Sequence, residues 1–377
     1  MTITFSGDIC VINPITKELN IESSVHSFFK NADYRFACFE APIYTDKAIS
    51  FNKVGPTLSQ HEDIAKLSNF FTHVSIANNH IMDYGNTGLK DTIEYLQKNN
   101  IAYAGAGHTF KEAYEPIYLI KNGIKVAVLC LAESQFGCCR YNDYPQCGYA
   151  WLLNPHIHKQ IQSLKKSCDY VICFTHAGLE MCDYPLPEWR SCYHSLIDSG
   201  CDIVIASHPH VIQGKEEYKG KSIYYSLGNF YFNNKYNDKR WTNSLSLFIT
   251  LEKRDIEIKE IFTNFTNNAI LLSDNHSQEH FTHLSSILED SNIDIYIDTI
   301  NREVIECWKK YYESYFSYPI YNNSRELKMR IFRRLFHKYL SKTIKPKVPA
   351  KFLFHNMMVD THRFAISRAI SILEQTY

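Results

Sequence analysis

Short apolar runs alternate with helix-like stretches from residue 1 to about residue 230, and this alternation constrains the fold more than any other feature. The runs are rich in Val, Ile, Phe and Tyr, which is typical of strands buried on both faces. Strands alternating with helices predict a layered α/β sheet. The expected strands are Thr2–Ser6, Tyr34–Phe39, His73–Ala77, Ile124–Leu131, Tyr170–Thr175, Asp202–Ala206 and Ser222–Ser226.

Helices are expected between these strands. Apolar residues at helical spacing predict helices over Glu62–Phe71 and Gly88–Lys98. A third helix is expected to begin at Pro187 and to end before Gly200, because proline favours the first turn and glycine follows the last. Leu245–Leu251 and Ile256–Phe262 have no obvious helix between them, so they are expected to form a hairpin that closes one sheet edge.

The amino-acid composition indicates how the chain divides into domains and which partners it can attract. The polar stretch after residue 265 predicts two parts, residues 1–265 and a mainly helical extension over residues 266–377. Lys plus Arg equals Asp plus Glu at 40 each, so no overall charge attracts nucleic acid and none is expected as a partner. The 12 cysteines form no C-x-x-C pair and are expected to be reduced. Neither a signal peptide nor an apolar membrane span is recognisable, which predicts a cytoplasmic protein.

Polar residues gather where the predicted strands end. Because the carboxyl ends of strands in an open α/β sheet build sites, we expect these side chains to meet at one rim. Carboxylate, amide and imidazole together suit divalent zinc, manganese or iron, and one carboxylate can bridge two ions. The predicted ligands are Asp8, Glu40, Asn79, His176, His208 and His210, with His80 and Asp83 beside them.

Each residue taken alone has a structural alternative. Asp8 could cap a helix or stabilise a turn, and Glu40 could be a loop carboxylate before Ala41-Pro42. His80 and Asp83, three residues apart, could be a capping arrangement. The case for a metal site therefore depends on the combination.

Four segments carry a resemblance to a known family: Phe5–Asp8, Ser75–Gly85, Ala206–Gln213 and Tyr224–Phe230. Over roughly residues 1–265 the chain resembles the bacterial capsule synthesis protein CapA family, also called the poly-γ-glutamate synthesis CapA/PgsA family. That family belongs to the calcineurin-like metallophosphoesterases, so the resemblance implies a layered α/β-β/α sandwich.

The resemblance also implies roles. Asp8 and His210 resemble first-metal ligands, and Asn79, His176 and His208 resemble second-metal ligands. Glu40 stands at the position of the bridging carboxylate. His80 resembles the histidine that assists the leaving group, and Asp83 is placed to orient it. Asp8-Ile9-Cys10 has a cysteine where the superfamily often has a histidine, which leaves open whether the first site fills.

The implied function is metal-dependent hydrolysis, of a phosphoester or an amide, in the synthesis of poly-γ-glutamate or a polysaccharide for the cell surface. A non-catalytic assembly subunit that retains a structural metal is the alternative. A binding module dominated by its basic tail is a third hypothesis. Residues 325–351 carry ten Lys or Arg and one acid, Glu326, which predicts a basic helix. That helix either packs on the main domain or contacts an anionic membrane or polyanion, in which case the protein is peripheral to the membrane.

Overall fold

The structure is a computed structural model that describes residues 1–46, 50, 53–68, 70–141, 148–234, 236–313 and 350–375. The chain separates into two compact units, Met1–Tyr296 and Ile297–Tyr377. The boundary that composition indicates near residue 265 remains a prediction.

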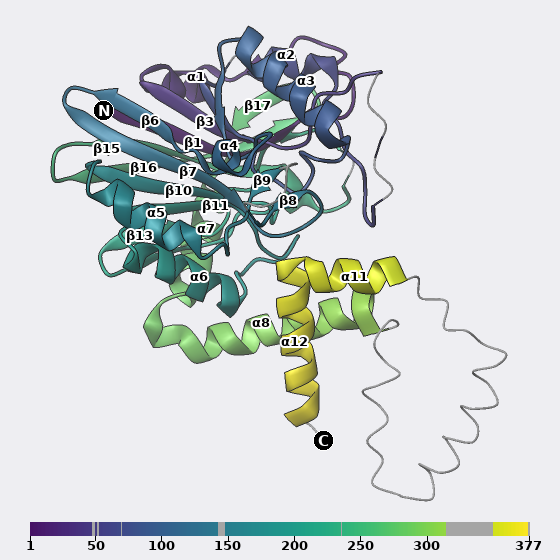
Figure 1. Cartoon of the computed structure of the whole chain (residues 1–377). Coiled ribbons are helices and arrows are strands. Elements are labelled where there is room, and N and C mark those ends of the chain that lie inside the picture. The colour runs from purple at the N-terminus through teal and green to yellow at the C-terminus, as the bar shows by residue number, and fades with distance from the viewer. Residues whose placement is uncertain are drawn as a thin grey trace, which may run out of the picture. The chain divides into compact units, whose positions relative to one another are not determined.

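Two large sheets form the first unit (Figure 1). The strands of the first sheet run in the order β2-β17-β16-β15-β1-β3-β4-β5, and β14 also pairs with β1. Their bounds are β1 Thr2–Cys10, β2 Asn20–Ile21, β3 Tyr34–Phe39, β4 His73–Ser75, β5 Ala102–Ala104, β14 Asn229–Phe232, β15 Asn243–Leu251, β16 Ile256–Thr266 and β17 Ala269–Leu272.

The second sheet has the order β12-β13-β11-β10-β7-β6. Its strands β7, β10, β11 and β13 are parallel, and the edge strands β6 and β12 are antiparallel to their neighbours. Two short strands, β8 Cys138–Cys139 and β9 Tyr149–Ala150, form a separate two-stranded sheet. The bounds are β6 Ile117–Lys121, β7 Ile124–Ala132, β10 Tyr170–His176, β11 Ile203–Ser207, β12 Lys215–Tyr218 and β13 Lys221–Tyr224.

Helices contact both sheets (Figure 1): α1 contacts β16 and β17, α3 contacts β5, α5 contacts β10 and α6 contacts β11. In α5, Ile157, Ile161 and Leu164 recur at helical spacing, and all three are buried. The bounds are α1 Ser23–Lys30, α2 Ala65–Ser68, α3 Gly85–Lys98, α4 Phe110–Tyr114, α5 His156–Lys165, α6 Pro187–Asp198 and α7 Asn275–Ile287, with 3₁₀ turns over Glu62–Ile64, Lys239–Thr242 and Asp290–Asn292.

The hydrophobic core lies between the two sheets. Phe5 of β1 packs against Phe36 of β3, with ring centroids 4.8 Å apart, and against Phe174 of β10 at 5.3 Å. Residues of both sheets belong to one buried cluster, so the sheets pack face to face. The predicted layered α/β sandwich is therefore confirmed.

The expected elements are present, with differences at their ends. Pro187 occupies the first turn of α6, as predicted. The hairpin is confirmed, because β15 and β16 pair antiparallel, but it does not close the sheet, since β17 and β2 continue beyond it. The predicted helix at Glu62–Phe71 is a 3₁₀ turn followed by the four-residue α2.

The segment after residue 266 is more structured than its polar composition indicates. Helix α7 buries Phe281 and Leu284, three residues apart on one face. The Phe281 ring lies 5.5 Å from that of Phe262 and 6.4 Å from that of Tyr224. A narrow apolar stripe is thus enough to attach α7 to the first unit.

The described part of the second unit is helical, as predicted. It contains most of α8 (Ile293–Cys307), a π-helical turn over Trp308–Tyr312, α11 (Ala350–Met358) and α12 (Asp360–Gln375). The basic stretch 325–351, with the helix expected in it, lies outside the described residues, apart from residues 350 and 351. None of the helices described has both the length and the apolar character that crossing a membrane requires.

One expectation about the cysteines is wrong. Ten of the described cysteines have free thiols, among them the buried Cys10 and Cys38. Cys139 is disulfide-bonded, so the set is not fully reduced.

Two glycines let β1 and β14 meet beside the strand ends. A Cβ atom added to Gly7 would lie 1.8 Å from the carbonyl oxygen of Gly228. The next residue, Asp8, donates its backbone N–H to that oxygen at 3.1 Å. Gly7 is therefore required for a close approach that sets the position of Asp8.

We expect Gly7→Ala to lower the free energy of unfolding by about 3 kcal/mol, because the backbone of Gly228 cannot move away without breaking the sheet. Gly123→Ala is the matched control: its φ is +75° but no atom lies within 4 Å of an added Cβ. That change should cost only about 1–2 kcal/mol. Urea unfolding of both variants measures the difference, and equal losses would contradict the steric explanation.

Candidate metal centre

The predicted ligands come from both sheets and meet at the carboxyl ends of their parallel strands. Asp8 lies in β1, Glu40 follows β3 and Asn79 follows β4. His176 is the last residue of β10, and His208 and His210 follow β11. All six side chains are buried.

Three of them converge on one point. The Nε2 atom of His176 lies 3.1 Å from Oδ1 of Asn79 and 3.1 Å from Nδ1 of His208. We name Asn79, His176 and His208 the histidine–amide group. Ligand atoms bound to one ion at 2.0–2.2 Å lie roughly 3.0–3.5 Å apart, so this spacing fits a metal site.

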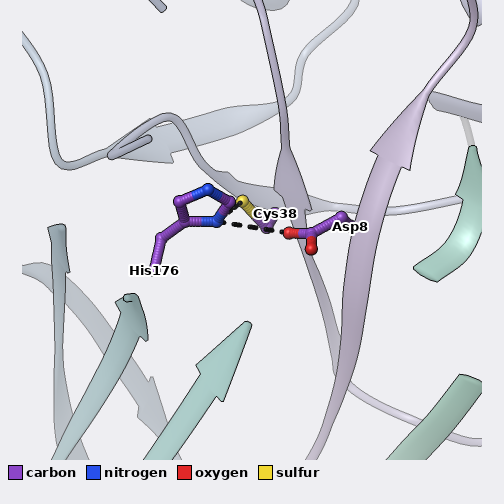
Figure 2. A group of neighbouring side chains, drawn as sticks. All are labelled: Asp8, Cys38 and His176. Atoms are coloured by element: carbon purple, nitrogen blue, oxygen red, sulfur yellow. Dashed lines mark hydrogen bonds and ion pairs between the residues drawn. The ribbon is translucent and has the colours of Figure 1, made fainter. Parts of the chain in front are cut away.

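In the rings of His176 and His208, the nitrogen that points away from the point of convergence, the outer nitrogen, faces hydrogen-bond acceptors. Nδ1 of His176 lies 3.3 Å from Oδ1 of Asp8, 3.1 Å from Oγ of Ser207 and 3.3 Å from Sγ of Cys38. Figure 2 shows this ring pointing at Asp8 and Cys38. Nε2 of His208 lies 3.2 Å from Oε1 of Glu133. The carboxylates therefore assign the ring protons to the outer nitrogens.

In the neutral rings, the form that binds a metal, this assignment leaves lone pairs on the two inner nitrogens. Burial lowers the pKa of His208, but Glu133 outweighs it and raises the pKa, so this ring gives up a proton when an ion binds. Together with the amide oxygen of Asn79, three acceptors then face one another at hydrogen-bond distance. Acceptors alone repel, and a cation between them removes the conflict. The residues present therefore fit a divalent ion.

Asp8, Glu40 and His210 form a second group, the carboxylate group, whose ligand atoms all lie within 4.8 Å of one another. Oδ2 of Asp8 lies 3.5 Å from Nδ1 of His210, and Oε1 of Glu40 lies 3.8 Å from its Nε2. Both oxygens of Glu40 are buried without a hydrogen-bond partner among the described residues. A buried carboxylate left in this state is a ligand suited to a cation.

Asp8 connects the two groups. Its Oδ1 faces His176 and its Oδ2 faces His210, and it also accepts the backbone N–H of His208 at 3.2 Å. Glu40, in contrast, faces His210 and His80. The contacts therefore make Asp8 at least as well placed between the two groups as the predicted bridge Glu40.

His80 and Asp83 are paired next to the carboxylate group. Nδ1 of His80 lies 2.7 Å from Oδ2 of Asp83, and its Nε2 lies 3.9 Å from Oε1 of Glu40. Asp83 also accepts the backbone N–H of Leu58 at 2.8 Å and pairs with Nζ of Lys53 at 2.5 Å. The carboxylate is thus fixed on both oxygens, and it directs Nε2 of His80 toward the centre.

Backbone strain accompanies the ligands. His208 and His210 have φ values of +99° and +59°, and Ala41, which follows Glu40, has +79°. Non-glycine residues adopt such values at a cost that surrounding structure must offset, and they cluster at functional sites. The Pro209 between the two histidines helps to bring their rings within 5.8 Å of each other, as the sequence indicated.

Burial and neighbouring charges act in opposite directions on the pKa values of several ligands. Burial lowers the pKa of His176 to about 4, so that ring is neutral and able to bind a metal. It raises the pKa of Glu40 to about 8. Burial lowers the pKa of His210, but the charges of Glu40 and Asp8 outweigh it and raise the pKa to about 10. Near neutral pH the carboxylate group therefore holds protons that an ion must displace.

We expect zinc or manganese binding to release protons and to tighten as the pH rises. At pH 7 the raised pKa values of Glu40 and His210 predict release of at least one proton. Affinity should then fall about tenfold for each pH unit lowered, per proton displaced. Calorimetric titration in two buffers of different ionisation enthalpy measures the released protons. Affinity that does not change between pH 6 and 8 would contradict this account.

Several neighbours of the centre were not predicted. Glu133 directly follows β7, so the strand-end rule that found the other ligands could have found it. Cys38 is the residue before the last one of β3, and Lys53 lies outside every motif. Glu180 is exposed, and its carboxylate lies within 4.8 Å of ligand atoms of His208 and His210.

The fold and the site together define an α/β sandwich with a buried carboxylate–imidazole centre suited to divalent ions. The bacterial capsule synthesis protein PGA_cap family matches residues 2–234. The chain belongs to this family.

Two relatives are similar over the same region. The capsule biosynthesis protein CapA of Bacillus anthracis is 32% identical over 260 residues, which are 65% of this chain and 61% of that protein. The PGA biosynthesis protein CapA of Bacillus subtilis is 32% identical over 255 residues, 65% of each chain. The match thus spans less than two thirds of either relative's length.

Among solved structures, a putative 5'-nucleotidase from Staphylococcus aureus is 14% identical, with a TM-score of 0.44, over 75% of this chain and 58% of that one. A likeness this distant carries no argument about activity.

Proposed function

We propose that this chain is a metal-dependent hydrolase of the metallophosphoesterase type that acts in the synthesis of a capsule or another surface polymer. The observation that carries the proposal is the histidine–amide group, in which three acceptors converge at 3.1 Å. Carboxylate, amide and imidazole donors suit manganese, zinc or iron. The polymer context comes from the relatives, whose names refer to capsule and PGA biosynthesis.

Two ions are proposed. Asn79, His176 and His208 would hold one, and Asp8, Glu40 and His210 would hold the other. When bound, such ions lower the pKa of a coordinated water and stabilise negative charge on a phosphorus or carbonyl centre. Glu40 was expected to bridge them, and Asp8 is the second candidate for that role because it contacts both groups.

His80 is proposed to give a proton to the leaving group. Its Nδ1–H donates to Asp83, which fixes the ring and leaves Nε2 to face the centre. The proton given to the leaving group is the one on Nε2, so the active form of His80 is the imidazolium, which becomes the neutral ring on transfer. Burial lowers the pKa of His80, although Asp83 opposes this effect. Lys53 compensates the charge of Asp83, so the pair is stable where it is buried.

A non-catalytic assembly subunit with a structural metal is the second candidate. The deep burial of the ligands favours it, since Asp8 and Glu40 have no exposed surface. Full metal occupancy without turnover would support this alternative.

Elemental analysis of the purified protein, joined to a hydrolase screen with and without manganese, tests the proposal. The screen should contain phosphomonoesters, phosphodiesters and γ-glutamyl amides, because the two ions would serve either class. We expect bound divalent metal and hydrolysis that a chelator abolishes. Protein that contains no metal, and gains no thermal stability from manganese or zinc, would overturn the proposal.

Contact of residues 325–351 with an anionic membrane or polyanion, and a cytoplasmic location, remain proposals. Flotation with liposomes that contain or lack anionic lipid tests the contact. Binding that does not respond to lipid charge or salt would argue against it.

A further inference from the structure

Asn229 is the first residue of β14 and follows a glycine in the motif Leu227-Gly-Asn-Phe230. Gly228 has a φ of +67° and lies against Gly7, so β14 pairs with β1 and Asn229 stands opposite Asp8. The motif thus places a buried amide beside the carboxylate group.

The hydrogen bonds of Asn229 decide which way its amide points. Nδ2 lies 2.9 Å from the carbonyl oxygen of Trp241 and 3.3 Å from that of His210. Only an N–H can satisfy two carbonyl oxygens, because the reversed amide would place three acceptors together. Oδ1 must therefore face Nδ1 of His210, from which it lies 2.9 Å.

This orientation fixes the His210 ring. Since Oδ1 only accepts, Nδ1 carries a proton and donates it to Asn229. Nε2 is then the nitrogen that faces Glu40 at 3.8 Å. The ring of Trp241, with its centroid 4.7 Å away, packs against the imidazole and limits its rotation.

Asp8 competes for the same proton. Its Oδ2 lies 3.5 Å from Nδ1 of His210, farther than the 2.9 Å to Asn229. If the amide were missing, Asp8 would be the nearest acceptor, and the two residues would form a buried ion pair. Both would then be less available to a cation.

We propose that Asn229 is a positioning residue that prevents this collapse: it accepts the Nδ1 proton, leaves Asp8 free and presents Nε2 of His210 to the first ion. This inference rests on the proposed metal centre and deepens it. It also assigns a role to the Leu227–Phe230 motif, which sequence reasoning left without one.

Asn229→Leu removes the acceptor at similar volume, and Asn229→Ala removes it without placing a bulky apolar side chain at the site. Asn233→Leu is the matched control, because the amide of Asn233 likewise both accepts and donates, accepting from the backbone of Ile12 and Asn13 and donating to that of Asn13, but it does not contact a ligand histidine. Bound zinc per chain is measured by mass spectrometry, and affinity is measured by calorimetry of the metal-free proteins.

We expect two ions in the wild type and in N233L, and the same change in N229A as in N229L. N229L should retain the ion of the histidine–amide group and bind the other roughly 10–100-fold more weakly. Retention of that one ion also shows that N229L is folded.

Folded N229L with two ions at wild-type affinity, or an equal loss in N233L, would overturn the inference while leaving the proposed function intact. If N229L does not fold, folded N229A with two ions at wild-type affinity overturns it instead. Wild-type protein that binds no ion overturns both.

Discussion

His208→Ala is expected to remove the ion from the histidine–amide group and to lower metal-dependent turnover by about 1,000-fold or more. The substitution deletes Nδ1, one of the three proposed metal-binding atoms of the group. The other two are Nε2 of His176 and Oδ1 of Asn79. It also leaves Glu133 without the ring that faces it at 3.2 Å. A catalytic ion contributes several kcal/mol to transition-state stabilisation, and each 1.4 kcal/mol is tenfold in rate.

His194→Ala is the matched control for His208→Ala. Nε2 of His194 lies 2.9 Å from Oε1 of Glu216, so the control also removes a histidine paired with a glutamate, outside the centre. Metal content and rate should then stay near wild type. H208A protein that keeps two ions and full activity would remove His208 from the centre.

His80→Ala is expected to lower turnover by roughly 10²–10⁴-fold while both ions remain bound. The reason is that Nε2 of His80 faces the centre at 3.9 Å from Glu40, whereas the six proposed ligands are other residues. The loss should be smaller with a nitrophenyl ester than with an alkyl ester, because nitrophenolate leaves without a proton. The hydrolysis rates of the two esters test the role in proton transfer, and the metal content of the variant tests whether both ions remain bound.

Two results would contradict the role of His80. Loss of an ion from H80A would make it a ligand, and equal losses on both esters would exclude proton donation to the leaving group. Asp83→Asn is a useful companion, because it keeps the shape of the pair but removes the charge that Lys53 faces.

The convergence of the proposed ligands at one rim could be predicted because the sequence signal for each residue is local. A short apolar run marks a strand, and the residue at its carboxyl end lies at the rim of the sheet, as Glu40 and His176 do. The same logic correctly predicted the layered fold. It also covered Glu133, which was overlooked although it follows β7 directly.

What could not be predicted depends on contacts between distant segments. Nothing near Lys53 indicates that its ammonium group would meet Asp83, 30 residues later. Cys38 meets His176 only because two sheets pack face to face. The position of α7 likewise depends on Phe281 reaching Phe262 and Tyr224, which a polar composition conceals.

The centre also has a consequence for the order of assembly. His208 donates its backbone N–H to Asp8 across a separation of 200 residues, and each proposed ion takes ligands from both sheets. Contacts this distant form only after the intervening chain has been made and its ends have met, which slows their formation. A nascent chain that has not yet reached His210 carries Asp8, Glu40 and Asn79 without their imidazole partners. Loading of the two proposed ions would therefore be a late event in the biogenesis of this protein.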